Sequence, residues 1–136
     1  MYPIELTSPM ESELEDAGFT PLKTAEAVEE CIKKSETTLV VVNSVCGCSA
    51  GSARPAAIKS IQNSKKPSNL ATVFAGVDQS AVSKARELMV PFPPSSPAIA
   101  LFKDGKVVHM LERHHIEGST AEMISENLVE AYNTYC

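Results

Sequence analysis

The chain has 136 residues, of which 43% are hydrophobic and 21% charged, which is the size and composition of one globular domain. The net charge of −5 argues against nonspecific binding to nucleic acid. No apolar run approaches the roughly 18 residues of a membrane-spanning helix, and residues 1–14 lack the pattern of a signal peptide. We therefore expect a cytoplasmic domain with no nucleic-acid or membrane partner.

The charge is unevenly distributed along the chain. Residues 1–36 hold nine acids and three bases, residues 37–111 hold three acids and eight bases, and residues 112–136 hold five acids and one base. One interpretation is that the flanking helices are acid-rich by chance of composition. The other is that the basic middle segment carries a site for an anion.

In chain order, the first elements that we expect are two helices. Ser8, Pro9 and Glu11 form a capping-box pattern that predicts a helix start, and Gly18 is a suitable end. A second helix is expected after Thr24, because apolar residues then recur on one helical face.

The next segments predict a strand–helix–strand unit. Residues 38–42 form a β-branched apolar run that is typical of a strand buried on both faces. A helix is expected over about 48–63, with Pro55 kinking it, and a second strand over 71–77. The crossover predicts parallel strands, and Asp78 is placed to cap a following helix that ends near residue 89.

The last part of the chain predicts a hairpin and a final helix. Strands are expected over 98–102 and 106–111, joined through Asp104-Gly105. A capping box that begins at Ser119 opens the helix that follows.

This order of elements predicts an α/β fold, a thioredoxin-like three-layer sandwich with a mixed four-stranded central sheet and extra N-terminal helices. We expect one domain, with residues 1–36 as an N-terminal helical extension and residues 37–136 as the redox core.

Cys46 and Cys48 lie where the buried strand ends and a helix begins. Unpaired N–H groups and the helix dipole stabilise a thiolate there, which lowers its pKa below the free value of about 8.5. Cys46 comes first and is expected to be more exposed, so we assign it as the nucleophile. Cys48 is the candidate resolving thiol. Gly47 relaxes the backbone between them, and a disulfide across this short spacing should be strained and easily reduced.

The cysteine pair has two other interpretations, which are two small buried residues or half of a metal site. Zinc usually takes four ligands, often in two pairs, and the further candidates are His109, His114 and His115. Cys31 is expected to be a core residue. Cys136 is either a thiol that resolves or dimerises, or a bystander at the end of the chain.

Ser96, Pro97 and Arg54 are candidate substrate contacts. Pro97 leads into the third strand, where thioredoxin-like folds place a cis-proline that faces the redox cysteines, so we expect a cis bond here. Because proline has no N–H, the preceding backbone at Ser96 is expected to be free to pair with an extended substrate. Arg54 either binds an anionic group of the substrate or is solvated.

Several stretches together resemble the bacilliredoxin family, which comprises thioredoxin-like proteins with a C-G-C site. The matching stretches are residues 40–48, Ala50-Gly51, Ala53-Arg54-Pro55-Ala56, Val73-Phe74-Ala75-Gly76, Ser95-Ser96-Pro97, Val107-Val108-His109, Arg113-His114, Ile116-Glu117-Gly118 and Cys136. The resemblance spans nearly the whole chain.

The resemblance implies reduction of mixed disulfides between proteins and bacillithiol, a carboxylate-bearing sugar thiol of some bacteria. It implies that Cys46 takes the bacillithiol moiety and that Cys48 or a second bacillithiol resolves the adduct, with Gly47, Ser96 and Pro97 in the substrate site. Bacillithiol is then a co-substrate, no cofactor or metal is tightly bound, and the partners are bacillithiolated client proteins. Weak disulfide isomerase activity is also implied. The alternatives are a C-x-C metal or iron–sulfur binding module and a noncatalytic redox sensor.

Overall fold

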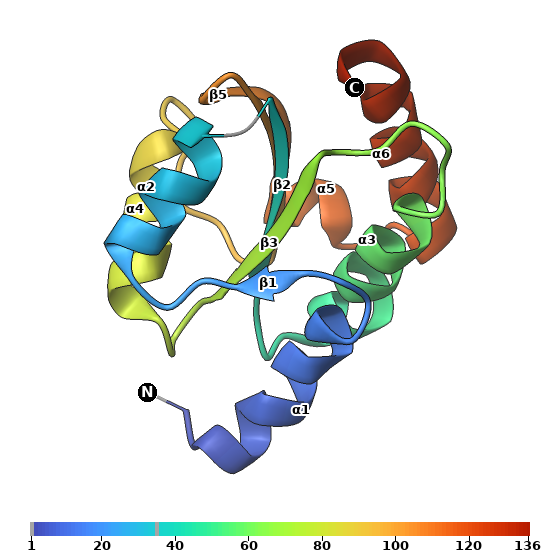
Figure 1. The fold of residues 1–136 in the computed structure, drawn as a ribbon. Coiled ribbons are helices and arrows are strands. Elements are labelled where there is room, and N and C mark those ends of the chain that lie inside the picture. Colours follow the sequence, from blue (N-terminus) through green and yellow to red (C-terminus); the bar gives the residue numbers. More distant parts are fainter. Residues whose placement is uncertain (1, 35) are drawn as a thin grey trace.

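The computed structural model describes residues 2–34 and 36–136, and it places one sheet between two layers of helices (Figure 1). The helices are α1 (Ile4–Glu15), α2 (Ala25–Lys34), α3 (Arg54–Ser60), α4 (Gln79–Leu88), α5 (Arg113–Ile116) and α6 (Ala121–Tyr135), and a π-helical turn, η1 (Ser49–Ala53), precedes α3. The strands are β1 (Thr20–Pro21), β2 (Thr37–Asn43), β3 (Asn69–Phe74), β4 (Ala98–Lys103) and β5 (Lys106–Leu111).

The sheet is mixed and has the strand order β1-β3-β2-β4-β5. Strands β1, β2 and β3 run parallel, whereas β4 is antiparallel to β2 and β5 is antiparallel to β4. The predicted three-layer sandwich is therefore confirmed, but the sheet has five strands instead of four. The additional strand, β1, pairs through Thr20 and Pro21 with Ala71 and Thr72, and two residues are too few to produce a periodic pattern.

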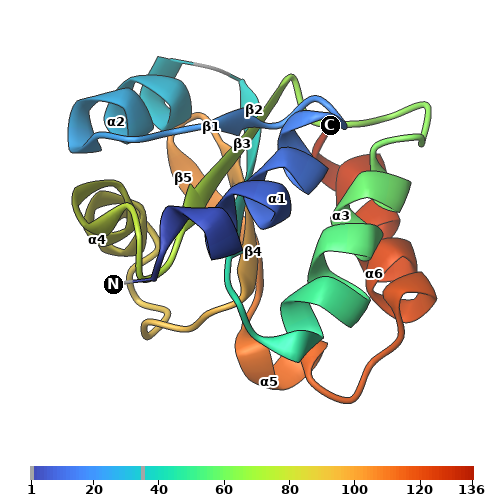
Figure 2. The ribbon, with the colours of Figure 1, turned by 90° about the horizontal axis from the view of Figure 1, so that it is seen from below.

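Strand β2 is buried along its whole length, and its side chains alternate between two cores. Leu39 and Val41 pack in the cluster beneath α3 and α6, whereas Val40 and Val42 pack in the cluster beneath α2 and α4. Figure 2 shows these helix pairs on opposite sides of the strands. The apolar run thus forms the doubly buried strand that the sequence predicts, and it fixes where residue 46 emerges.

The first helix begins at Ile4, not at Ser8 as predicted. Pro3 occupies the N-cap position, so it already provides a proline at the helix start, and Pro9 lies inside the helix at the cost of one backbone hydrogen bond. Gly18 follows the end of the helix with a φ of +109°, a left-handed conformation that suits the predicted stop.

The predicted helix over 48–63 is divided into η1 and α3, and Pro55 causes the division. In an α-helix its ring would clash with the carbonyl one turn earlier, and it has no N–H to donate. The wider π-turn avoids the clash, because the Arg54 N–H bonds to the Ser49 carbonyl five residues back. Pro55 then falls in the first turn of α3, where no N–H is needed, and the predicted kink at Pro55 stays a prediction.

Asp78 holds the N-cap position of α4 without capping it. Its carboxylate accepts a hydrogen bond from the Phe74 N–H (3.3 Å) and pairs with Lys23 (3.4 Å). Strand β3 therefore ends at Phe74, before the predicted residue 77, because the Asp78 carboxylate accepts the hydrogen bond of the Phe74 N–H.

The cap of α6 is Thr120, not Ser119. Thr120 Oγ1 accepts from the Met123 N–H at 3.1 Å, whereas Ser119 Oγ donates to the carbonyl of His115 in the preceding turn. The hairpin prediction is confirmed, since Asp104 and Gly105 both have positive φ between β4 and β5.

Residues 1–36 contribute more than the predicted helices, because β1 lies within this range and joins the sheet. The division into an extension and a redox core stays a prediction. None of the helices in residues 2–34 and 36–136 has the length and apolar character needed to cross a membrane.

Leu128, on the buried face of α6, is 1% exposed, whereas Met123 on the same helix is 58% exposed. We expect Leu128→Ala to lower the free energy of unfolding by about 2–5 kcal/mol, because it removes buried methyl groups and leaves a cavity. Met123→Ala should change it by less than about 0.5 kcal/mol. Urea unfolding of both variants measures this, and equal losses would contradict the packing described for α6.

Candidate active site

The sulfur atoms of Cys46 and Cys48 lie 2.7 Å apart, just beyond the end of β2. The Cys46 carbonyl accepts hydrogen bonds from the backbone N–H groups of Ser49 (3.0 Å) and Ala50 (3.3 Å), so Cys46 stands at the start of the helical segment. Gly47 between them is exposed, and a side chain added there would meet nothing within 4 Å. The predicted strand-end, helix-start placement is confirmed, and the surface beside the two sulfurs is open.

The two thiols differ in their affinity for a proton. Hydrogen bonds from the Cys48 thiol and the Cys48 backbone N–H lower the pKa of Cys46, and the positive charge of Arg113 lowers it further. Burial raises the pKa of Cys48, and the adjacent Cys46 sulfur raises it again. These directions favour Cys46 as the thiolate and Cys48 as the thiol that donates to it. They support the assignment of nucleophile and resolving residue, which stays a prediction.

Arg113 is the site residue that sequence reasoning missed. It opens α5, and its Nη2 lies 3.3 Å from Cys46 Sγ although the two residues are 67 positions apart. The same guanidinium donates through Nη1 to the Ser96 carbonyl (3.3 Å) and contacts Glu117 Oε2 through Nε and Nη2 (3.2 Å each). The one sequence signal was that Arg113 belongs to a stretch that carries the family resemblance.

The Ser96–Pro97 peptide bond is cis, as predicted. The carbonyl of Ser96 is not free, however, because it accepts from Arg113 Nη1. The Ser95 hydroxyl is also engaged, since it accepts from the Arg113 backbone N–H at 2.6 Å. A carbonyl oxygen accepts up to two hydrogen bonds, so the contact with Arg113 does not exclude an extended substrate there, and the expected pairing at Ser96 stays a prediction.

Arg54 is only 3% exposed, so the interpretation that it is solvated is wrong. Its Nε donates to Glu13 (2.9 Å), and its Nη1 donates to Asn43 Oδ1 (2.9 Å), the Ser44 carbonyl (3.0 Å) and Ser49 Oγ (3.2 Å). Direct substrate binding by Arg54 would require these groups to give way. The contacts instead tie the loop before Cys46 to η1.

Asn43 is the centre of this buried network. Its Oδ1 accepts from the Ser44 N–H (2.8 Å) and Ser49 Oγ (3.0 Å) as well as from Arg54, and its Nδ2 donates to the Met10 carbonyl of α1 (3.1 Å). Helix α1 thus supports the cysteine loop through Asn43. In addition, Ser44 Oγ accepts from the Cys46 N–H at 2.9 Å.

The positions of the other basic residues argue against an anion site built from the basic middle segment. Lys59 pairs with Glu122 of α6, Lys84 pairs with Glu29 of α2 and Glu87 of its own helix, and Arg54 is buried. Lys103 ends β4 at the opposite end of the sheet from Pro97. The cation beside Cys46 is Arg113, which comes from the acidic C-terminal segment.

The two other cysteines lie away from this pair. Cys31 is half-buried against the α2–α4 core, and burial raises its pKa, as expected for a core residue. Cys136 lies beside Thr37, which begins β2, whereas Cys46 follows the strand's end. Six strand steps separate the two ends by about 20 Å, so Cys136 is too far away to resolve an adduct on Cys46 within one chain.

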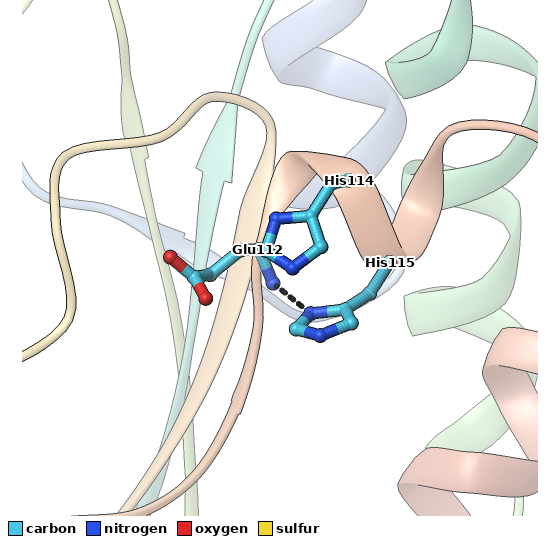
Figure 3. A group of neighbouring side chains, drawn as sticks. All are labelled: Glu112, His114 and His115. Carbon is cyan, nitrogen blue, oxygen red and sulfur yellow. Dashed lines mark hydrogen bonds between the residues drawn. The ribbon is translucent and has the colours of Figure 1, made fainter.

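Glu112, His114 and His115 at the start of α5 lie side by side (Figure 3). Their ligand atoms all lie within 4.8 Å of one another, and His115 Nδ1 accepts from the Glu112 N–H. Among the described residues this is the group that could hold a metal, and neither Cys46 nor Cys48 belongs to it. The geometry therefore offers the cysteine pair no third ligand of this kind in residues 2–34 and 36–136.

Comparison with known proteins gives consistent results for sequence and fold. The family described as "Disulphide isomerase" matches residues 2–136. A bacilliredoxin of Cytophaga hutchinsonii is 59% identical over 98% of both chains, and one of Shouchella clausii is 52% identical over 99% of this chain and 94% of its own. Mitochondrial thioredoxin 3 of Saccharomyces cerevisiae superposes with a TM-score of 0.59 over 90% of this chain and 98% of its own, at 17% identity. Fasciola hepatica thioredoxin gives 0.59 over 87% and 100%, at 20% identity, so the fold is thioredoxin-like.

Replacing Cys48 by alanine removes the thiol that donates to Cys46, so we expect the pKa of Cys46 to rise. The thiolate is the reactive form, and alkylation of Cys46 in the unaltered protein should therefore speed up as pH rises through this pKa and then level off. A pH titration of thiolate absorbance and alkylation rate measures both effects. In Cys48→Ser the pKa of Cys46 should stay partly lowered, and in Cys31→Ala it should be the same as in the unaltered protein. An unchanged pKa in Cys48→Ala would show that the pair does not set it.

Arg54→Met keeps much of the side-chain volume but removes the guanidinium from its buried partners. We expect the free energy of unfolding to fall by roughly 1.5–3 kcal/mol, the range for hydrogen bonds to a charged group. Chemical unfolding measures the loss, with Lys59→Met as the control because the Lys59 side chain is 56% exposed. Similar values for the two variants would mean that the network around Asn43 contributes little.

Proposed function

The chain belongs to the bacilliredoxin family, and from that membership we propose that it removes bacillithiol from mixed disulfides on client proteins. It is a thiol–disulfide oxidoreductase in which Cys46 is the nucleophile. The observation that carries the proposal is the sulfur of Cys46 at a helix start, hydrogen-bonded to both Cys48 and Arg113.

The first step is a thiolate–disulfide exchange. The Cys46 thiolate attacks the bacillithiol sulfur of the mixed disulfide, the bond between that sulfur and the client breaks, and a Cys46–bacillithiol disulfide forms. The client leaves as a thiolate and takes up a proton from water. Arg113 Nη2 and the Cys48 thiol, both within hydrogen-bond distance of Cys46 Sγ, favour the ionised form that attacks.

The adduct is then resolved by a second thiolate. Cys48, once deprotonated, attacks Cys46 Sγ and releases bacillithiol, which leaves an oxidised Cys46–Cys48 pair that two electrons from small thiols must reduce. A second bacillithiol attacking the bacillithiol sulfur of the adduct instead gives bacillithiol disulfide and the Cys46 thiolate directly. Burial, the first cause of the raised pKa of Cys48, persists in the adduct and slows the first route near neutral pH, whereas the effect of the Cys46 sulfur is lost once that sulfur is in a disulfide.

Such exchange needs thiols that are kept reduced, so we place the protein in the cytoplasm. The same Cys46 chemistry, applied to a disulfide between two protein thiols, would give a weak isomerase activity.

The decisive test traps the intermediate. Cys48→Ala protein is mixed with a stoichiometric amount of a bacillithiolated client peptide, and the protein is analysed by intact-mass and peptide mass spectrometry. We expect one bacillithiol on Cys46 and release of the reduced peptide. Cys46→Ala should give no adduct, and Cys31→Ala, which leaves the pair intact, should turn over catalytically.

Absence of the Cys46 adduct would refute the proposed function. Stoichiometric metal or iron–sulfur content that is lost in Cys46→Ser would instead identify a metal-binding module. Oxidation of the pair with no turnover of excess substrate would identify a redox sensor.

A further inference from the structure

Building on the proposed function, we propose that Arg113 binds a carboxylate of the small thiol that is transferred to Cys46, and that Glu117 occupies this carboxylate position beforehand. The recognised chemistry is an anionic group on a low-molecular-weight thiol. The subsite lies on α5 and not on the helical segment that follows the cysteines. Helix α5 contacts the loop that contains the cis-proline.

The orientation of the guanidinium carries the inference. Nη1 is directed to the Ser96 carbonyl, which leaves the edge formed by Nε and Nη2 for another partner. Both nitrogens of that edge contact Glu117 Oε2 at 3.2 Å. This is the edge through which arginine binds planar carboxylates. Glu117 therefore marks where a carboxylate fits.

One nitrogen of this edge, Nη2, also contacts the sulfur of Cys46. Nη2 contacts both Glu117 Oε2 and Cys46 Sγ, at 3.2 Å and 3.3 Å. A carboxylate in place of Glu117 would thus be separated from Cys46 Sγ by one bridging nitrogen. A small thiol joined to Cys46 through its sulfur can place its own carboxylate there, whereas a thiol without an anionic group cannot.

Glu117 is suited to being displaced. Its side chain is 57% exposed and that of Arg113 is 47% exposed, and an exposed pair of this kind is weakly held. Arg54, by contrast, is buried and fixed by partners on three elements. At the start of α5, Glu112 bonds to His115 through its backbone, and among the described residues the ion pair of Arg113 is with Glu117, not with the Glu112 carboxylate.

The experiment compares two mixed disulfides on one neutral client peptide. One carries 3-mercaptopropionate and the other its neutral amide, so the two differ only in the carboxylate. Single-turnover rates of transfer to Cys46 are measured in Cys48→Ala protein at physiological salt, which screens long-range attraction. We expect the carboxylate to be preferred by roughly two- to fivefold, since an exposed charge pair of this kind contributes less than one factor of ten.

Two variants separate binding of the carboxylate from stabilisation of the thiolate. In Arg113→Gln the ratio of the two transfer rates should fall to near one. A raised pKa of Cys46 would slow both substrates equally, but it would not change this ratio. In Glu117→Gln the preference should increase several-fold, because the internal competitor is gone. Glu126→Gln, an exposed acid on α6, should leave the preference unchanged.

Each outcome bears on one claim. Equal slowing of both substrates in Arg113→Gln with the preference intact would overturn the carboxylate subsite but leave Cys46 as nucleophile. A preference that does not increase in Glu117→Gln would overturn the role of Glu117 as a competitor. Failure of both disulfides to react at Cys46 would refute the proposed function itself, so the two failures are distinguishable.

Discussion

One hydrogen bond, from the Cys48 thiol to the Cys46 sulfur, organises the chemistry of this molecule. Two cysteines so close together would share a proton without preference if their surroundings were alike. Here the helix-start N–H groups and Arg113 act on Cys46, while burial acts on Cys48, so the two pKa values move in opposite directions. The pair is thereby divided into a sulfur that favours the ionised form and a sulfur that keeps its proton.

Two arginines serve this pair in different ways, and their burial explains the difference. Arg54 is enclosed between α1, the end of β2 and η1, where its hydrogen bonds hold the backbone that leads into Cys46. A charge in that position is fixed, because losing Glu13 would leave it without a counter-charge away from water. Arg113 stands at the surface with exchangeable partners. A buried support and an exposed cation beside Cys46 thus come from separate guanidinium groups, and α1 takes part in the support through Glu13 and the Met10 carbonyl.

The sequence predicts those parts of the structure that depend on local pattern. The buried run of β2, the hairpin at Asp104 and the cysteines at a strand end all follow from periodicity and turn chemistry over a few residues. Strand β1 and helix α5 are not predicted in this way, because segments of two and four residues are too short to show a hydrophobic period. The π-turn before Pro55 depends on a clash that becomes visible only once a helix is built through it.

Charge along the chain is a poor guide to charge around the site, for the same reason. The segment average made the middle of the chain look like the anion-binding part, yet its lysines pair on outer helices or lie at the far end of the sheet. A single arginine from an acidic segment supplies the positive charge, because β5 and the short α5 return the chain to the cis-proline loop. An isolated cation among acids is also more selective than a basic patch. Neighbouring carboxylates such as Glu117 repel anions that cannot reach the guanidinium edge, so under the proposed function the favoured anion is one that a thiol on Cys46 delivers to that edge.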